Sequence, residues 1–271
     1  MHWSCRQKTK SMLSNFISRE KQQFDKRIHE IDLFRGFLII LVMFDHFMWC
    51  LSFYIFHHQN PELVWYMNSE LRKVIREVVL CAFMFTCGIS CFLSKNNKRR
   101  GLLLLALVIA IAVVTHLLQL LPLFDNRVII IDFNILGVIA LSILVFSLVE
   151  KRRSVDICLV IFALIAFYSF LIIKPVDSSE TYNPFLNVLY PFTDPVKGKN
   201  VADYLPLFPY IIFLFLGVLF ARQYYVNRTS LFKKKGNWER GICFLGRHTL
   251  FIYIAHEVLF TLIFMLIGLI I

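Results

Sequence analysis

The sequence contains few charged residues, and this scarcity indicates the class of the protein. Only 17% of the 271 residues are Asp, Glu, Lys or Arg, whereas 58% are hydrophobic and 28 are phenylalanine. The charges are also segregated, because long runs hold none and short runs hold several. This composition excludes an ordinary soluble domain and predicts an integral membrane protein.

Cysteine pairs suited to a disulfide or metal framework are also missing. The seven cysteines include no CxxC spacing, and Cys81, Cys87, Cys91 and Cys158 fall in apolar runs. We therefore expect buried, reduced thiols and no metal. Residues 1–30 lack an apolar core of their own, so we expect no cleavable signal peptide and an uncleaved signal-anchor in the first membrane helix.

The sequence also lacks the alternating pattern of membrane β-barrel strands, which leaves α-helices as the expected membrane-spanning elements. The predicted fold class is therefore all-α, a polytopic bundle of about seven transmembrane helices. The runs that are long and apolar enough to span a bilayer are 33–55, 74–94, 101–121, 128–149, 155–173, 204–221 and 247–270.

The distribution of lysine and arginine predicts the orientation of the bundle. Seven lie in residues 1–30, four in 94–100, three in 150–154 and seven in 222–247. The alternate loops hold far fewer, which places the N-terminus in the cytoplasm and the C-terminus outside. The net charge of +11 therefore reflects topology, and we expect no nucleic-acid partner.

The predicted domain organisation is simple. Residues 1–30 form a basic cytoplasmic segment, which is either a plain topology signal or a surface that binds anionic membrane lipid. Residues 31–271 form a single transmembrane domain. Its outer loop, residues 174–203, is long enough to have a function and rich enough in aromatic residues to form a packed cap.

Three ionisable residues share one stripe of the first predicted helix. Arg35 and His46 are eleven residues apart, which at ~100° per residue leaves only ~20° between them around the axis and ~16 Å along it. Asp32 lies ~40° from His46 on the same count. Ionisable groups at membrane depth are rare unless they pair or have a function, so this stripe requires an explanation.

His46 is the residue of this stripe that is best suited to chemistry. A histidine is able to act as a general base near neutral pH, and a carboxylate from Asp45 or Asp203 is a candidate to orient it. The alternative is a neutral histidine that hydrogen-bonds two helices together. For Arg35 and Asp32 the alternative is an ion pair at a helix end.

The last predicted helix carries a second polar group. Thr249, Tyr253 and His256 share one face, and Glu257 follows directly. This group lines either a cavity or a contact with a neighbouring helix, and the sequence does not decide between the two.

Five stretches in a fixed order make the chain resemble the catalytic membrane domain of heparan-α-glucosaminide N-acetyltransferases and their bacterial relatives, within the wider class of transmembrane acyltransferases. The stretches are IDLFRG with MFDH, FMFTCGIS, DFNILGVIALSIL, DYLPLFPYIIFLFLGVLFAR and LGRHTLFIYIAHE, and together they span residues 28–257. In the third stretch the family usually shows a histidine where this chain has Gly137.

The resemblance implies transfer of an acyl group, often acetyl from acetyl-CoA, to a sugar or other cell-envelope acceptor at the bacterial cytoplasmic membrane. It makes His46 the catalytic base or acyl carrier, and it assigns Arg35 to the negative charge of the acyl-CoA donor or to the walls of its pocket. Asp32 is a second candidate for the electrostatics of that pocket. Asp203 and Tyr204 would lie on the acceptor side, where His256 and Asp45 are further candidates. A small membrane transporter and an inactive relative are the alternatives, and the oligomeric state is not predicted.

Overall fold

The computed structural model describes residues 28–56, 59–120, 131, 133–151, 154–172, 188–189, 204–232 and 236–270. All elements of regular secondary structure in these ranges are helices. The predicted N-terminal segment, nearly all of the predicted outer loop and Asp203 lie outside the described residues.

Seven apolar helices lie at the seven positions that the sequence predicts. Four are long and apolar enough to span a membrane, and three are shorter. The prediction of a polytopic helical membrane protein is therefore confirmed. The long helices are α2 (His29–Cys50, continued by the π-helix η1, Leu51–Ile55), α4 (Glu70–Leu93), α5 (Asn97–Gln119) and α11 (Thr249–Ile270), and the shorter ones are α6 (Ile135–Val149), α7 (Val155–Ile172) and α9 (Ile211–Tyr224).

Side-chain caps account for helix starts that differ from the predicted boundaries. The Asn134 side chain accepts a hydrogen bond from the Leu136 N–H, so α6 begins at Ile135 instead of residue 128. Ser69 caps α4 in the same way through the Arg72 N–H, which extends that helix back to Glu70.

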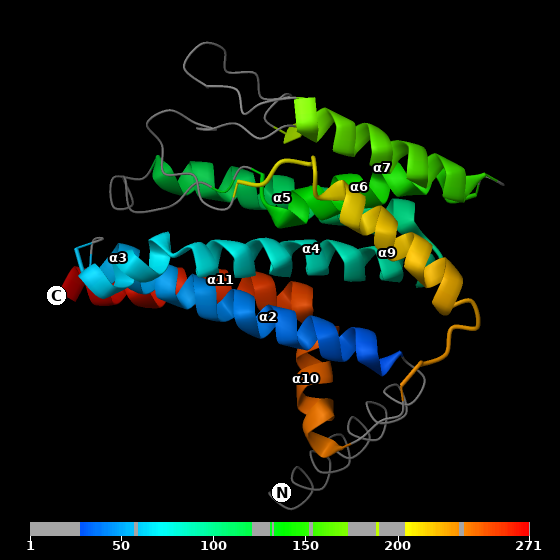
Figure 1. Cartoon of the computed structure of the whole chain (residues 1–271). Coiled ribbons are helices and arrows are strands. Elements are labelled where there is room, and N and C mark those ends of the chain that lie inside the picture. The colour runs from blue at the N-terminus through cyan, green and yellow to red at the C-terminus, as the bar shows by residue number, and fades with distance from the viewer. Residues whose placement is uncertain are drawn as a thin grey trace, which may run out of the picture.

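Two helices occur where the sequence predicted only loops. Helix α3 (Pro61–Asn68) begins at an Asn60 cap followed by proline, an arrangement typical of helix starts. Helix α10 (Asn237–Arg247) lies across the direction of the long helices and leads into α11 (Figure 1). The basic segment 222–247 is therefore partly helical, and α10 brings Arg247 against the bundle.

Glycines permit two very close helix crossings. A Cβ atom on Gly88 of α4 would collide with the Leu214 carbonyl of α9, and one on Gly217 of α9 would collide with the Phe85 carbonyl of α4. Gly36 of α2 is equally close to the Ile242 carbonyl of α10. Small residues at such crossings let membrane helices pack backbone to backbone.

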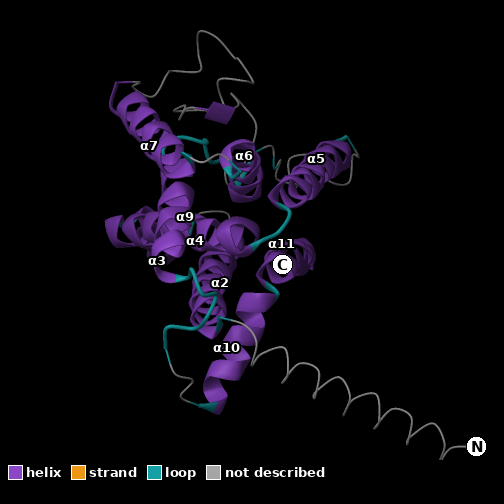
Figure 2. Ribbon diagram, turned by 90° about the vertical axis from the view of Figure 1, so that its right-hand side faces the viewer, coloured by secondary structure: helices purple, strands orange, loops and turns teal. Residues whose placement is uncertain are grey.

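In the end-on view of Figure 2, α2 and α11 lie on one side of the bundle and α5 and α6 lie on the other. Helix α4 lies in the middle and packs against α9, α2 and α6. Helix α11 packs along α2 and η1, whereas α5 packs along α6. The fully buried core lies around the central helices and includes Met84, Val138 and Leu214.

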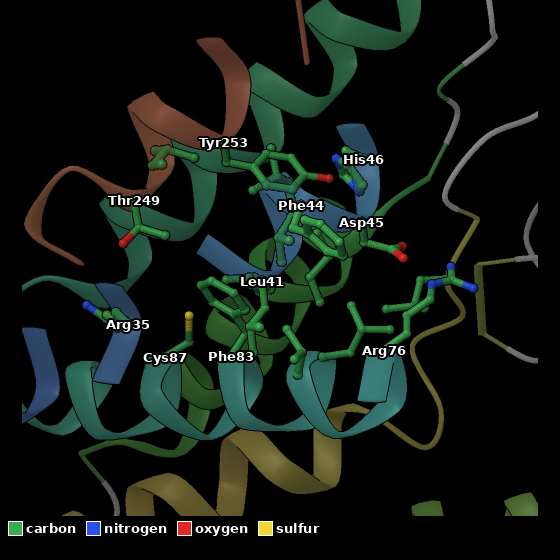
Figure 3. Close-up of a pocket in the computed structure, with 18 of the residues that line it drawn as sticks. Arg35, Leu41, Phe44, Asp45, His46, Arg76, Phe83, Cys87, Thr249 and Tyr253 are labelled. Carbon is green, nitrogen blue, oxygen red and sulfur yellow. The ribbon is translucent and has the colours of Figure 1, made fainter. Parts of the chain in front are cut away.

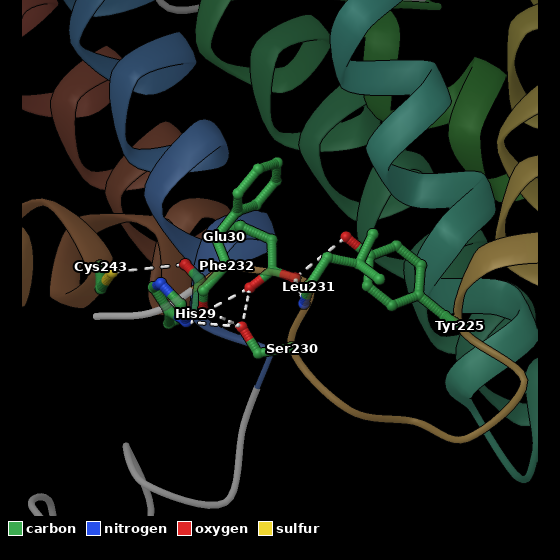
Figure 4. Close-up of polar contacts among 7 residues, drawn as sticks. All are labelled: His29, Glu30, Tyr225, Ser230, Leu231, Phe232 and Cys243. Atoms are coloured by element: carbon green, nitrogen blue, oxygen red, sulfur yellow. Dashed lines mark hydrogen bonds and ion pairs between the residues drawn. The ribbon is translucent and has the colours of Figure 1, made fainter. Parts of the chain in front are cut away.

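The segment after α9 fixes the start of α2 (Figure 4). Glu30 accepts hydrogen bonds from the Leu231 N–H at 2.7 Å, from the Tyr225 hydroxyl at 3.2 Å and from the Ser230 hydroxyl. The His29 ring contacts Ser230 Oγ at 2.8 Å. These contacts hold α2 in position at the end that carries Arg35.

Candidate active site

A cavity of about 870 Å³ lies between α2, α4, α5, α6 and α11. Arg35 lines one end, and Arg76 lies at the other with Asp45 and His46 on its side (Figure 3). Two members of the predicted stripe, Arg35 and His46, thus border one continuous space. Its volume is in the upper part of the range that small-molecule and cofactor pockets occupy.

His46 is the centre of a polar cluster on the cavity wall. Its Nδ1 atom lies 2.6 Å from Glu257 Oε1 and 2.9 Å from His256 Nε2. The two imidazole rings stack with their centroids 5.1 Å apart, and the Tyr253 ring meets His46 edge-on. Helices α2 and α11 pack together along this stretch, so residues more than 200 positions apart in sequence meet here.

The hydrogen bonds indicate which ring nitrogens carry protons. His256 Nδ1 lies 2.9 Å from the Ile252 carbonyl oxygen, which only accepts, so Nδ1 of His256 is the protonated atom. In neutral His256 the Nε2 atom then accepts, and His46 Nδ1–H donates toward it and toward Glu257. In a neutral His46 ring this tautomer places the lone pair on Nε2, the form that a general base requires.

His46, His256 and Glu257 are also a combination that could bind a metal, since their ligand atoms lie within 4.8 Å of one another. Ligand atoms around a tetrahedral zinc, at bonds of ~2.0–2.1 Å, lie ~3.3 Å apart. The separations of 2.6 and 2.9 Å at His46 Nδ1 are shorter than that. The geometry therefore fits a hydrogen-bonded chain better than a shared ion.

Asp45 forms an ion pair with Arg72 of α4. Its carboxylate accepts two hydrogen bonds from Arg72, at 2.6 and 2.9 Å, and a third from the Tyr66 hydroxyl at 3.2 Å. Such a two-point pair is the strong geometry for arginine and carboxylate. Burial raises the pKa of Tyr66, and the Asp45 charge raises it further, so this phenol remains a hydrogen-bond donor.

The opposite end of the cavity is lined by three arginines from three helices. One guanidinium nitrogen of Arg35 donates to the Thr86 carbonyl at 2.9 Å and to Ser90 Oγ at 2.7 Å. Arg100 of α5 donates to the Ser90 carbonyl at 3.2 Å, so two guanidinium groups meet at one serine. Arg247 is the third arginine of this set.

Asp32 faces helix α10 and is buried. Its Oδ2 lies 3.9 Å from Arg247 Nε, and both side chains are largely buried. The ion pair of Asp32 therefore crosses between helices, whereas the sequence suggested one within α2. Asp32 is not among the residues that line the cavity, but it balances an arginine that does.

The remaining predicted residues have different outcomes. Tyr204 is half-buried and precedes Leu205, which lines the cavity, whereas Asp203 lies outside the described residues. Gly137 is not part of the cavity wall, and the Phe133 ring fills the space where a side chain at this position would begin. Gly137 therefore does not itself contribute to the cavity that His46 borders.

Sequence reasoning missed several cavity residues. Arg100 and Arg247 were counted as loop charges that report orientation, and Arg72 fell in the predicted outer loop 56–73, yet each lines the cavity. Their position at helix ends was the available signal. Tyr66 was missed because α3 was predicted as a loop, although Asn60 and Pro61 mark its start.

Comparison with known proteins assigns the chain to a family. Neither the curated proteins nor the solved structures give a match to this chain. A family model does, and it is described as heparan-alpha-glucosaminide N-acetyltransferase, catalytic. It matches residues 27–258, which include every described element from α2 to the polar cluster on α11. The chain therefore belongs to the heparan-α-glucosaminide N-acetyltransferase catalytic domain family, a family of membrane acyltransferases.

Proposed function

We propose that this protein transfers an acetyl or other acyl group from a cytosolic acyl-CoA to a sugar or other cell-envelope acceptor, with His46 as general base. The observation that carries the proposal is the pairing of His46 with Glu257 on the wall of a cavity whose far end holds three arginines. Membership of the family supports the reaction type, and the geometry supports the residue roles.

The polar cluster supports base catalysis by His46. Nε2 takes the proton from the acceptor hydroxyl or amine as its oxygen or nitrogen attacks the thioester carbonyl carbon. The new C–O or C–N bond forms, the C–S bond breaks, and the CoA thiolate leaves with the proton from Nε2–H. Glu257 fixes the tautomer and stabilises the imidazolium between these two steps, as the carboxylate does in a Ser-His-Asp triad.

The arginine end supports binding of the donor. Arg35, Arg100 and Arg247 offer planar guanidinium groups, which match the oxygens of the phosphates that CoA carries. The ~16 Å along α2 between Arg35 and His46 would be bridged by the extended arm of the donor. The low-polarity middle of the cavity would limit wasteful hydrolysis of the thioester.

The charge distribution supports the orientation of this reaction. Arg35, Arg100 and Arg247 lie at the ends of helices that adjoin the lysine- and arginine-rich loops, which face the cytoplasm under the positive-inside rule. The donor would thus enter from the cytoplasm and the acceptor would meet His46 from the opposite half of the membrane. The resemblance to bacterial relatives supports a location in the bacterial cytoplasmic membrane.

Consumption of acetyl-CoA by membrane vesicles tests this proposal. Inverted vesicles that contain the protein should consume added acetyl-CoA, and right-side-out vesicles should not. In purified protein, Arg35→Ala should raise the KM for acetyl-CoA at least tenfold, because a charge-assisted contact is worth ~1.5–3 kcal/mol. Arg99→Ala is the matched control, since Arg99 is exposed on the same side and does not line the cavity.

Acetylpantetheine lacks the nucleotide phosphates of acetyl-CoA, so it distinguishes a phosphate-binding role of Arg35 from a structural role in the cavity wall. If Arg35 binds those phosphates, the Arg35→Ala variant should use acetylpantetheine as well as the wild type does. An equal loss with both donors would assign Arg35 to the cavity wall. No consumption of either donor by the wild type would contradict the proposed function.

A further inference from the structure

The middle of the cavity is apolar, although its two ends are rich in arginine. Between Arg35 and His46 the walls are formed by aliphatic and aromatic side chains from α4, α5 and α6, such as Leu80, Leu104 and Ile139. A free sugar gains little from such walls, because its hydroxyl groups lose hydrogen bonds to water without replacement. The lining favours a ligand that carries an apolar chain.

Among the described residues, the cavity is closed on one side and open on another. Val79, Leu136 and Ile143 form its inner wall and are 6%, 5% and 3% exposed. Leu103 of α5 and Leu250 of α11 also line it, yet they are 61% and 45% exposed. One opening therefore lies between α5 and α11, which stand apart in the end-on view of Figure 2, and a second lies at the other end of the cavity, where Trp65 and Leu71 are 73% and 71% exposed.

The opening between α5 and α11 faces the hydrocarbon of the bilayer. Leu103 and Leu250 belong to helices that are long enough to span a membrane. Leu41 and Phe44 of α2, which lie between Arg35 and His46, also line the cavity and are 46% and 54% exposed (Figure 3). Apolar side chains as exposed as these on membrane-spanning helices contact lipid chains, so a ligand that passes between α5 and α11 comes from the membrane.

We propose that the acceptor is a membrane-resident amphiphile whose apolar chain enters sideways between α5 and α11, and whose polar headgroup reaches His46. The inference rests on the proposed function and names the class of its acceptor. The end of the cavity nearest His46 offers N–H donors from Arg72 and Arg76 for an oxygen-rich headgroup, beside the Tyr66 hydroxyl that donates to Asp45. The volume of about 870 Å³ leaves space for such a chain beside the arm of the donor.

Photo-cross-linking tests the sideways route directly. The full chain is placed in nanodiscs that contain phosphatidylcholine with a diazirine in its acyl chain, irradiated, and mapped by mass spectrometry. We expect cross-links on the inner wall, at Val79, Leu136 or Ile143, in addition to the outer surface. Labelling confined to outer residues such as Leu148, which is 75% exposed, would overturn the proposal.

A matched pair of variants locates the entrance. Leu103→Trp adds bulk at the opening and should reduce inner-wall cross-links at least fivefold. Leu102→Trp adds the same bulk one position earlier, where the side chain is 49% exposed but does not line the cavity, and it should leave them unchanged. Equal effects of the two variants would overturn entry between α5 and α11.

The acyl chain of the donor is the competing source of an apolar chain. Turnover of acetyl-CoA and palmitoyl-CoA by the wild-type protein separates the two sources. We expect kcat/KM for palmitoyl-CoA to be no higher than for acetyl-CoA, whereas a preference of tenfold or more for palmitoyl-CoA would assign the opening to the donor and overturn the proposal. Inner-wall labelling without turnover of either donor would instead refute the proposed function, so the two failures are distinguishable.

Discussion

Two clusters on α2 contain the same kinds of side chain but lie at opposite ends of the helix and have different surroundings. His29 and Glu30 stand at the start of the helix, with a His–Glu separation of 3.2 Å. His46 stands one turn before the end of α2 and contacts Glu257 at 2.6 Å. His29 and Glu30 join the start of α2 to the segment after α9, and we call this pair the clamp. Residue type and His–Glu distance therefore do not distinguish the clamp from a candidate catalytic pair.

The surroundings of the two clusters make the difference. Glu30 accepts from a backbone N–H and two hydroxyl groups of the segment after α9, and neither His29 nor Glu30 lines the large cavity. His46 lines that cavity, and its hydrogen bonds leave a lone pair on Nε2. A histidine–glutamate pair becomes a candidate for chemistry only where a substrate is able to reach it.

Replacing the two histidines should therefore separate activity from stability. We expect His46→Ala to lower kcat for acyl transfer by ~10²–10⁴-fold, the usual contribution of a general base. His29→Ala should leave kcat per folded molecule within about threefold of the wild type, because no proton transfer depends on it. Steady-state turnover of radiolabelled acetyl-CoA in nanodiscs measures both, and comparable losses in the two variants would contradict the distinction.

Replacing Glu30, the glutamate of the clamp, should lower stability instead of activity. Glu30→Gln weakens three hydrogen bonds to a largely buried carboxylate and should cost ~1–3 kcal/mol of unfolding free energy. Glu70→Gln is the control, because Glu70 is 84% exposed and pairs with Lys73 one turn away, a contact worth ~0.5 kcal/mol or less. Thermal unfolding in detergent, followed by circular dichroism, reports the difference. A smaller loss for Glu30→Gln than for Glu70→Gln would remove the clamp from the account.

The clamp should also respond to alkaline pH through Tyr225. Burial raises the pKa of this phenol above its ordinary value of 10.0, and the charge and hydrogen bond of Glu30 raise it further. Above about pH 10 the unfolded chain loses this proton and the folded chain keeps it, so stability falls by up to ~1.4 kcal/mol per pH unit. The melting temperature of Tyr225→Phe should therefore fall less steeply than that of the wild type between about pH 9 and 11. Parallel curves would show that Tyr225 does not contribute to the pH dependence.

The features that depend on one helix were predictable from the sequence. The hydrophobic runs predicted seven apolar helices, and the angle count placed Arg35 and His46 on one stripe of α2, where they border the same cavity. The first result follows from the length of apolar helix that a bilayer requires, and the second follows from the rotation of ~100° per residue in an α-helix. The caps at Ser69 and Asn134 changed only the helix boundaries.

The features that depend on contacts between helices were not predictable. Sequence analysis noted His256 and Glu257 but gave no reason to pair them with His46, because that contact arises from the packing of α11 along α2. Arg100 and Arg247 appeared as loop charges until α5 and α10 brought them to the cavity. Asp45, one of the two carboxylates named as candidates to orient His46, lies instead in a two-point contact with Arg72.

The central claim is that His46 and Glu257 act as one unit, and a double-variant cycle tests it most directly. Acyl-transfer rates are measured for His46→Ala, Glu257→Gln and the double variant in the same nanodiscs. If Glu257 acts only by holding and charging His46, its loss alone should lower kcat at least tenfold, and the double variant should be no slower than His46→Ala. Losses that multiply across the two sites would contradict the account, because they would show that the two residues act independently.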